Sequence, residues 1–287
     1  MGMLQALALA IIQGATEFLP VSSKTHLALA SKLFGWGDVP LDFVVTLHVG
    51  TLLAVVVYFR RDLWAICSSP FRLGGPGVPD GGGVQAPARQ EGAESPRDHV
   101  RLLGLLALAT IPAAAAGYKL EHRLEGLLNN TMLDGAGLLV TALLLVIASR
   151  LKGTRGLRQT GWRQALLVGC AQACALLPGV SRSGSTIAGS LACGMSREWA
   201  PRFSFLLSVP VILGGAAVKV KDLLHGGASA KFDPLTYGVS ALLAAVVGYL
   251  AILLVIDSIK RGNLLYFAAY CGLVGVTAIL AGALGLI

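Results

Sequence analysis

A short stretch near the start of the chain holds several side chains that can bind a cation, transfer a proton or attack an electrophile. They are the amide, carboxylate, hydroxyl and imidazole groups of Gln13, Glu17, Ser22, Ser23 and His26. Gln13 and Glu17 are four residues apart and share one face of a helix, which Pro20 then ends. Apolar runs flank the stretch, and a charge at the bilayer centre costs about 2.5–3.5 kcal/mol. The cluster therefore indicates a functional site within a membrane; the alternative is a solvated loop at its surface.

A second polar stretch, "PGVSRSGSTIAG" at residues 178–189, has the composition of an anion-binding site. Pro178 and Gly179 end one helix. Hydroxyls, a guanidinium and open backbone N–H groups then precede the next apolar run; their residues are Ser181, Arg182, Ser183, Gly184, Ser185 and Thr186. N–H groups at a helix start and a bidentate arginine both suit phosphate. We predict a phosphate clamp around Arg182; the alternative is an arginine that extends to the membrane surface.

The composition is that of a polytopic helical membrane protein. Of the 287 residues, 55% are hydrophobic and 13% are charged, and the mean hydropathy is +0.71. A soluble domain of this length needs far more surface charge. The net charge of +8 does not indicate nucleic-acid binding, because the basic residues lie in loops between apolar runs, as the positive-inside rule predicts.

Ten apolar segments follow one another along the chain. Their approximate ranges are 3–19, 20–35, 42–59, 100–118, 133–150, 164–178, 184–195, 203–221, 235–257 and 264–287. Six of them are expected to cross a hydrocarbon core of about 30 Å. The first, second, sixth and seventh are short, and Pro20 and Pro178 break them at polar residues. We predict two re-entrant helix hairpins, since irregular backbone at membrane depth must be enclosed by protein or line a water-filled cavity.

The two short pairs resemble each other, which predicts two inverted repeats of five segments each. "FLPVSSKTHLALASKLFG" aligns with "LLPGVSRSGSTIAGSLACG" when one residue is inserted after the proline. We predict a single membrane domain over 1–287, with a first repeat over 1–150 and a second over 164–287. Residues 60–99 are rich in Gly, Pro and charge, which predicts a flexible cytoplasmic loop.

The charges of the loops orient the chain. The loop at 151–163 carries Lys152, Arg155, Arg158 and Arg163 and no acid, so this end of the molecule should be cytoplasmic. Both termini then lie outside, and the two hairpins enter from opposite sides. Their bends can meet near the midplane, where broken helices of repeat proteins form binding sites.

Together the two stretches describe a phosphatase for a lipid-soluble substrate. A carboxylate and substrate phosphates commonly hold Mg²⁺, and an activated serine or histidine can be the nucleophile. Positioning and charge stabilisation do most of the work in phosphoryl transfer. A polyprenyl-phosphate transporter or flippase is the alternative function, because a carrier needs only the anion site.

The sequence resembles the bacterial undecaprenyl-diphosphate phosphatases of the bacitracin-resistance type over nearly the whole chain except residues 60–99. The resemblance rests on "QGATEFLPVSSKTHL", "PGVSRSGSTI" and "FSFLLSVP". It implies hydrolysis of undecaprenyl diphosphate, left after cell-wall polymerisation, to undecaprenyl phosphate and inorganic phosphate. It also implies Mg²⁺ or Ca²⁺ and a pocket open to the periplasmic side of the bacterial inner membrane. A homodimer is left open.

The resemblance also suggests roles for individual residues. Glu17, helped by Gln13, would hold the cation or act as a base. Ser23 would be the nucleophile and His26 its proton acceptor, with direct attack by His26 as the competing possibility. The residues expected to bind the diphosphate are Ser22, Gly179, Ser181, Arg182, Ser183 and Thr186.

The chain departs from the family pattern at three positions. Many members carry Glu where this chain has Gln13, which places more of the cation binding on Glu17. Many carry a small residue and Gly where Lys24 and Thr25 stand. Outside the two motifs, His48 is expected to hydrogen-bond within the helix bundle or to lie near the site, with the first interpretation favoured.

Overall fold

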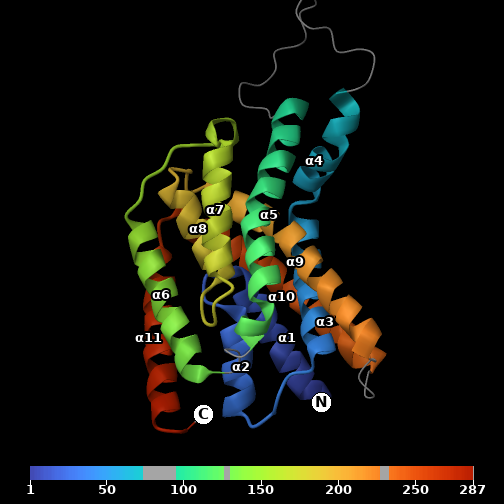
Figure 1. Ribbon diagram of the computed structural model, residues 1–287, viewed down its shortest axis with the longest axis vertical. Helices are drawn as coiled ribbons and strands as arrows, with labels where there is room; N and C mark the ends of the chain where they lie inside the picture. The colour runs from blue at the N-terminus through green and yellow to red at the C-terminus, as the bar shows by residue number, and fades with distance from the viewer. Residues whose placement is uncertain (74–94, 126–129, 227–232, 287) are drawn as a thin grey trace, which may run out of the picture.

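The part of the chain that the structure describes is built of helices (Figure 1). The computed structural model describes residues 1–73, 95–125, 130–226 and 233–286. The α-helices are α1 Met3–Phe18, α2 Ser23–Leu33, α3 Leu41–Tyr58, α4 Arg60–Leu73, α5 Pro96–Glu125, α6 Thr131–Ser149, α7 Trp162–Cys174, α8 Arg182–Ala192, α9 Trp199–Gly226, α10 Pro234–Lys260 and α11 Leu264–Ala283. The described residues form isolated β-bridges but no strand. The predicted all-α class is confirmed, and each of the ten predicted segments corresponds to a helix.

Six helices, α3, α5, α6, α9, α10 and α11, are long and apolar enough to cross a membrane. They are the six segments that the sequence predicts to span. The remaining segments, which form the two short pairs, are α1, α2, α7 and α8. The longest of these, α1, has 16 residues and extends about 24 Å at 1.5 Å per residue, which is less than the hydrocarbon core. Their re-entry into the bilayer stays a prediction.

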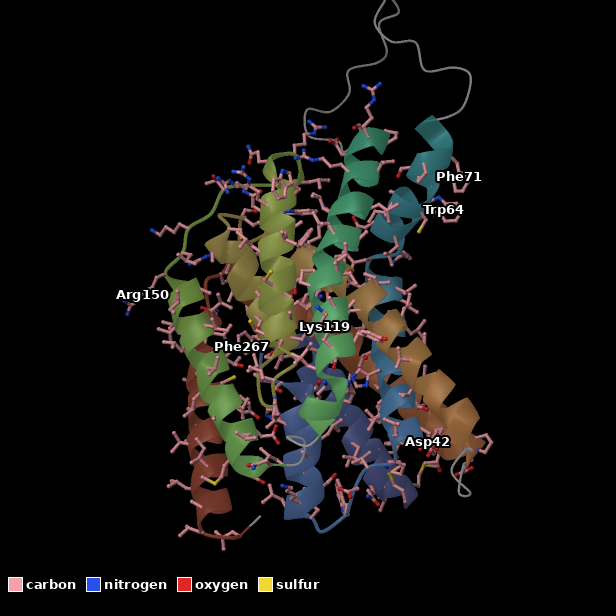
Figure 2. All side chains as sticks on the ribbon, viewed as in Figure 1. Asp42, Trp64, Phe71, Lys119, Arg150 and Phe267 are labelled. Atoms are coloured by element: carbon pink, nitrogen blue, oxygen red, sulfur yellow. The ribbon has the colours of Figure 1, made fainter. Side chains whose placement is uncertain are left out.

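One predicted loop contains a helix. The whole of α4 and the start of α5 lie within residues 60–99, which we predicted to be flexible; residues 74–94 lie outside the described part of the chain. On α4, Trp64 and Phe71 are 71% and 84% exposed (Figure 2), whereas Ser69 is buried. Sequence reasoning missed this amphipathic helix because the Gly-rich and Pro-rich residues that follow it dominate the composition of the range.

The short helices are held against spanning helices by close backbone contact. A Cβ atom on Gly14 of α1 would lie 2.7 Å from the carbonyl oxygen of Ala244 on α10. A Cβ on Gly169 of α7 would lie 2.4 Å from the carbonyl oxygen of Ala109 on α5. Small residues allow such approach between helices in membranes. Figure 1 shows α1 and α2 toward the end with both termini, and α7 and α8 toward the opposite end.

An aromatic cluster fixes the end of α1. Phe18, the last residue of α1, is fully buried and meets Phe205 of α9 edge to face, with ring centroids 5.6 Å apart. Phe59 also packs on Phe205, at 6.4 Å between centroids. Edge-to-face pairs contribute about 0.5–1.5 kcal/mol beyond their buried area. Because Phe18 follows Glu17 directly, this packing also fixes the position of the acid.

Candidate active site

The first bend of the chain joins α1 to α2. Leu19 has extended backbone angles, as expected for a residue before proline, and α1 ends there. Ser22 then has a φ of 69° and is the one non-glycine residue with positive φ in the described ranges. Such backbone strain costs about 1–3 kcal/mol and concentrates at functional sites. The strained residue lies directly before the predicted nucleophile, Ser23.

The carboxylate of Glu17 is the centre of the site. Glu17 is 8% exposed, and Gln13 is fully buried on the same face of α1. Glu17 Oε2 accepts hydrogen bonds from Gln13 Nε2 at 2.8 Å and from Ser23 Oγ at 2.7 Å. The structure therefore groups Gln13, Glu17 and Ser23, as the sequence predicts.

The second bend joins α7 to α8 and builds the start of α8. Gly179 has a φ of +78°, a conformation that glycine adopts without strain. Ser181 caps α8, accepting a hydrogen bond from the backbone N–H of Gly184 at 3.1 Å. Its hydroxyl also lies 3.2 Å from that of Ser183. Thr186 donates back to the carbonyl oxygen of Arg182 at 2.9 Å, so its hydroxyl stabilises the helix start.

The two bends meet at Arg182. Its Nη2 donates to Glu17 Oε1 at 2.7 Å, although the two residues are 165 positions apart. Ser183 Oγ donates to the carbonyl oxygen of Leu19 at 2.9 Å. Arg182 Nη1 is buried and has no hydrogen-bond partner among the described residues. A guanidinium N–H inside the protein with no acceptor loses favourable energy, so this group is available to an anion.

The imidazole of His26 does not bond to Ser23. His26 Nδ1 lies 2.8 Å from the carbonyl oxygen of Ser22 and must donate to it, which leaves Nε2 to accept from the hydroxyl of Tyr270 at 2.8 Å. The two rings also stack, with centroids 5.6 Å apart. Ser23 and His26, expected to be nucleophile and proton acceptor, therefore share no hydrogen bond, because the serine hydroxyl donates to the carboxylate of Glu17, the stronger acceptor.

Three further residues lie at the site. Sequence reasoning did not place Tyr270 or Asp134 there, and a position near the site was its second interpretation for His48. His48 Nε2 lies 3.7 Å from Glu17 Oε2, while its Nδ1 bonds to the carbonyl oxygen of Val44 within α3. Tyr270 bonds His26, and the buried Asp134 of α6 accepts from Thr25. The available signal was an ionisable side chain within an apolar run, which marks a functional site in membrane proteins. His48 and Asp134 both carry this signal.

The residues predicted to bind phosphate are placed differently. Arg182 lies beside Glu17 with a free N–H, and the hydroxyls of Ser181, Ser183 and Thr186 are engaged in hydrogen bonds within the protein. Ser22 and Gly179, in contrast, lie on the side of the bends that faces α6, where both line a cavity with Asp134. The structure therefore brings only part of the predicted set next to the carboxylate.

Two protein oxygens are suited to a divalent cation. Gln13 Oε1 is buried and lacks a hydrogen-bond partner among the described residues, and the Glu17 carboxylate lies one turn away. Among all the residues that the structure describes, there is no cluster of three or more His, Cys, Asp or Glu residues that could hold a metal ion. One amide and one carboxylate are a suitable but incomplete ligand set for Mg²⁺, which commonly takes its remaining ligands from water and substrate phosphates.

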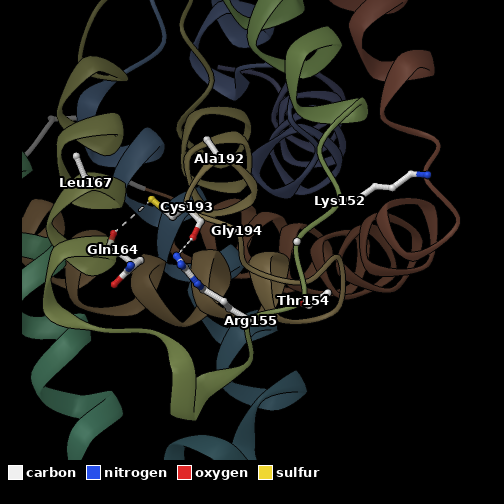
Figure 3. A pocket seen from close by; sticks show the side chains of 9 residues that line it. Lys152, Thr154, Arg155, Gln164, Leu167, Ala192, Cys193 and Gly194 are labelled. Carbon is white, nitrogen blue, oxygen red and sulfur yellow. Dashed lines mark hydrogen bonds between the residues drawn. The ribbon is translucent and has the colours of Figure 1, made fainter.

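A pocket of about 450 Å³ lies elsewhere, beyond the C-terminal end of α8 (Figure 3). Lys152 and Arg155 line it, and Arg155 Nη1 donates to the carbonyl oxygen of Cys193 at 2.7 Å. Arg182 stands at the other end of α8, about 15 Å away along an 11-residue helix. The pocket lining has no carboxylate and is separate from the Glu17 site.

Comparisons with known proteins identify the family of the chain. The family model described as "Bacitracin resistance protein BacA" matches residues 6–277. A protein named undecaprenyl-diphosphatase from Alcanivorax borkumensis is 42% identical over 274 residues, which are 95% of this chain and 96% of that protein. Proteins of the same name from Desulforapulum autotrophicum and Carboxydothermus hydrogenoformans are 37% and 35% identical, each covering at least 98% of both chains. With its six apolar spanning helices, the chain is a multi-pass membrane protein that belongs to the bacitracin resistance protein BacA family.

Proposed function

We propose that this protein is a membrane phosphatase that hydrolyses undecaprenyl diphosphate to undecaprenyl phosphate and inorganic phosphate. The relatives that are named undecaprenyl-diphosphatase and align over the full chain support the substrate. The observation that carries the chemistry is the Glu17 carboxylate, which accepts from Ser23 on one bend and from Arg182 on the other. An acid, a hydroxyl and a guanidinium thus converge at one point.

Arg182 and the start of α8 bind the diphosphate in this proposal. The free Nη1 of Arg182 and the unpaired hydroxyl of Ser185 are donors for phosphate oxygens. The N-terminal end of α8 adds its partial positive charge. Arg182 pairs with Glu17 at 2.7 Å. Substrate phosphate would therefore compete with Glu17 for the guanidinium.

Ser23 is the nucleophile that this geometry favours, and Glu17 is its proton acceptor. Attack of Ser23 Oγ on the terminal phosphorus breaks the bond to the bridging oxygen, releases undecaprenyl phosphate and leaves a phosphoserine. The serine proton passes to Glu17, 2.7 Å away. Water then attacks the phosphoserine and gives a proton to the inorganic phosphate and to the departing serine oxygen through Glu17, which releases its own proton to solvent, so that the serine and the carboxylate are both restored. His26 orients the bend through Ser22; direct attack by His26 is the competing route.

A divalent cation, Mg²⁺ or Ca²⁺, completes the proposed site. Gln13 Oε1 and the carboxylate of Glu17 are the protein groups that would hold it, together with substrate phosphate oxygens. Such an ion neutralises charge on the diphosphate. The orphaned amide oxygen supports this assignment, because a buried acceptor without a donor otherwise costs about 1–3 kcal/mol.

The site faces the outer side of the bacterial inner membrane in this proposal. The loop at 151–163 is basic, which favours a cytoplasmic location for that end. The first bend would then be reached from the side of the termini, where the lipid diphosphate is left after cell-wall polymerisation.

Phosphate release by the purified protein tests the function. Wild-type protein in detergent should release phosphate from undecaprenyl diphosphate with Mg²⁺ or Ca²⁺ present and should stop when EDTA is added. Arg182→Lys keeps the charge but loses the planar fork, so we expect kcat/KM to fall by about 10²-fold or more. Lys119→Arg, the reverse exchange on α5, serves as the control. A wild-type protein that binds the lipid without releasing phosphate would indicate a transporter, and an active Arg182→Lys variant would contradict the clamp.

A further inference from the structure

Asp134 is a buried acid that the proposed chemistry does not use. It lies in the first turn of α6 and is 7% exposed. An acidic residue near a helix N-terminus is favoured by the helix dipole, but that effect does not require burial. A carboxylate inside a membrane protein needs polar partners. The partners of Asp134 come from both bends of the active site.

On the first bend, Asp134 contacts Thr25. Asp134 Oδ1 accepts from Thr25 Oγ1 at 3.1 Å, and Thr25 is fully buried. Thr25 Oγ1 lies in turn 3.2 Å from Ser22 Oγ. Ser22 carries the positive φ of 69° and immediately precedes Ser23. A chain of hydrogen bonds thus runs from α6 to the strained residue beside the proposed nucleophile.

On the second bend, Asp134 contacts Gly179. The backbone N–H of Gly179 faces the Asp134 side chain, and a Cβ on Gly179 would lie 2.1 Å from the Asp134 carbonyl oxygen. The contact continues along the same face of α6. A Cβ on Gly137 would lie 2.0 Å from the carbonyl oxygen of Pro178, and Thr141 Oγ1 accepts from the backbone N–H of Ser181 at 2.9 Å. This face of α6 supports the loop that ends at Arg182.

A small cavity separates the two bends at this point. It has a volume of about 80 Å³, and its lining includes Ser22, Lys24, Asp134 and Gly179. Lys24 and Lys32 place positive charge near Asp134. The bends bond directly to each other at Arg182–Glu17 and Ser183–Leu19, whereas space remains between them on the side of this cavity. On this side, Asp134 bonds to Thr25 of the first bend and packs against Gly179 of the second.

We propose that Asp134 is a positioning residue that holds the two bends together on the side that faces α6. Through Thr25 it reaches the hydroxyl of Ser22, the residue before Ser23, and at Gly179 it meets the loop before Arg182. The inference rests on the proposed function, because it concerns how Ser23 and Arg182 are aligned for the diphosphate. Misplacement by about 1 Å can lower a rate by 10²-fold, so a residue that touches no substrate can control turnover.

Four variants test this role. Asp134→Ala should lower kcat by about 10- to 100-fold and change KM by less than about threefold, since Arg182 keeps its other supports. Asp134→Asn retains an acceptor oxygen for Thr25 and should recover at least a fifth of wild-type kcat. Thr25→Val should resemble Asp134→Ala, and the double variant should be no slower than the slower single one. Such non-additivity identifies residues that act as a unit.

Asp42→Ala is the matched control. Asp42 also lies in the first turn of a spanning helix and accepts from a tyrosine, Tyr237, at 3.0 Å. A purely structural role for Asp134 predicts equal losses of Tm and no loss of kcat in both variants. We expect Asp42→Ala to lower Tm without changing kcat, whereas Asp134→Ala lowers kcat at a comparable Tm.

Hydrogen–deuterium exchange separates this inference from the proposed function. Peptides that cover residues 19–25 and 176–186 should exchange faster in Asp134→Ala than in wild type or Asp42→Ala, with or without substrate. Unchanged exchange in both peptides, or a folded Asp134→Ala with kcat within twofold of wild type, would overturn the positioning role. A wild-type protein that releases no phosphate would overturn the proposed function and leave the exchange result standing.

Discussion

Ser23 and His26 are the two side chains that could attack phosphorus, and their hydrogen bonds differ. Ser23 donates to Glu17, whereas both nitrogens of His26 are engaged by Ser22 and Tyr270. We therefore expect Ser23→Ala to lower kcat by about 10³-fold or more, as for the loss of a nucleophile. His26→Gln, which removes only an orienting group, should lower it by less than about 10²-fold.

The measurement is steady-state phosphate release from the lipid diphosphate at saturating cation. Tyr270→Phe is a useful companion, because it removes the donor to His26 Nε2 and preserves the ring stack. Loss of activity in His26→Gln that exceeds the loss in Ser23→Ala would assign the nucleophile to the imidazole.

Sequence reasoning identified the residue types of the site better than their partners. The i, i+4 spacing places Gln13 and Glu17 on one face, and the structure has them hydrogen-bonded. Helical periodicity cannot determine which acceptor Ser23 meets, because that depends on the direction of the bend after Pro20. It also cannot identify contacts from another helix, such as His48 on α3 and Asp134 on α6.

At the scale of elements, the close approach of α1 to α10 should control where Glu17 lies. A methyl group on Gly14 would stand 2.7 Å from the carbonyl oxygen of Ala244 and 2.9 Å from Cβ of Val247. One of the helices must shift, and overpacking of this kind costs about 1–3 kcal/mol. We expect Gly14→Ala to lower both Tm and activity, since Glu17 follows one turn later on the same helix.

Gly238→Ala is the control for this prediction. Gly238 lies on α10 with no atom near its added Cβ, so alanine there should be neutral or stabilising by up to about 1 kcal/mol. Thermal unfolding in detergent, followed with the activity assay, compares the two variants. Equal Tm values for both would show that α1 is not held by this contact.

The elements themselves were largely predictable because lipid imposes length and polarity on each helix. The apolar runs predicted ten segments, each of which corresponds to a helix. Several of these helices are longer than the predicted segment; α5, for example, begins at Pro96 rather than near residue 100. Charged side chains can continue a helix beyond the hydrocarbon core, where hydropathy gives no signal. Hydropathy also gave no signal for α4, because its apolar and charged residues together do not form an apolar run.

At the scale of the whole molecule, the two ends differ in charge. Many basic side chains lie at the end opposite the termini (Figure 2). Some pair with acids, as in Arg158–Asp98 at 3.1 Å and Lys260–Glu198 at 2.9 Å. The loop at 151–163 nevertheless contains basic residues and no acid. This asymmetry is the basis for placing that end in the cytoplasm, and it determines from which side substrate enters.

Cysteine labelling can test this orientation in cells. In a chain whose five cysteines are replaced by serine, Asp38→Cys and Thr154→Cys introduce single thiols at exposed positions near opposite ends. A membrane-impermeant maleimide should label Asp38→Cys in intact spheroplasts and should label Thr154→Cys only after permeabilisation. Both variants should retain phosphate release, because neither position lies in the Glu17–Arg182 site. The reverse pattern would place the basic loop outside, so that lipid diphosphate would have to reach Glu17 and Ser23 from the cytoplasmic side.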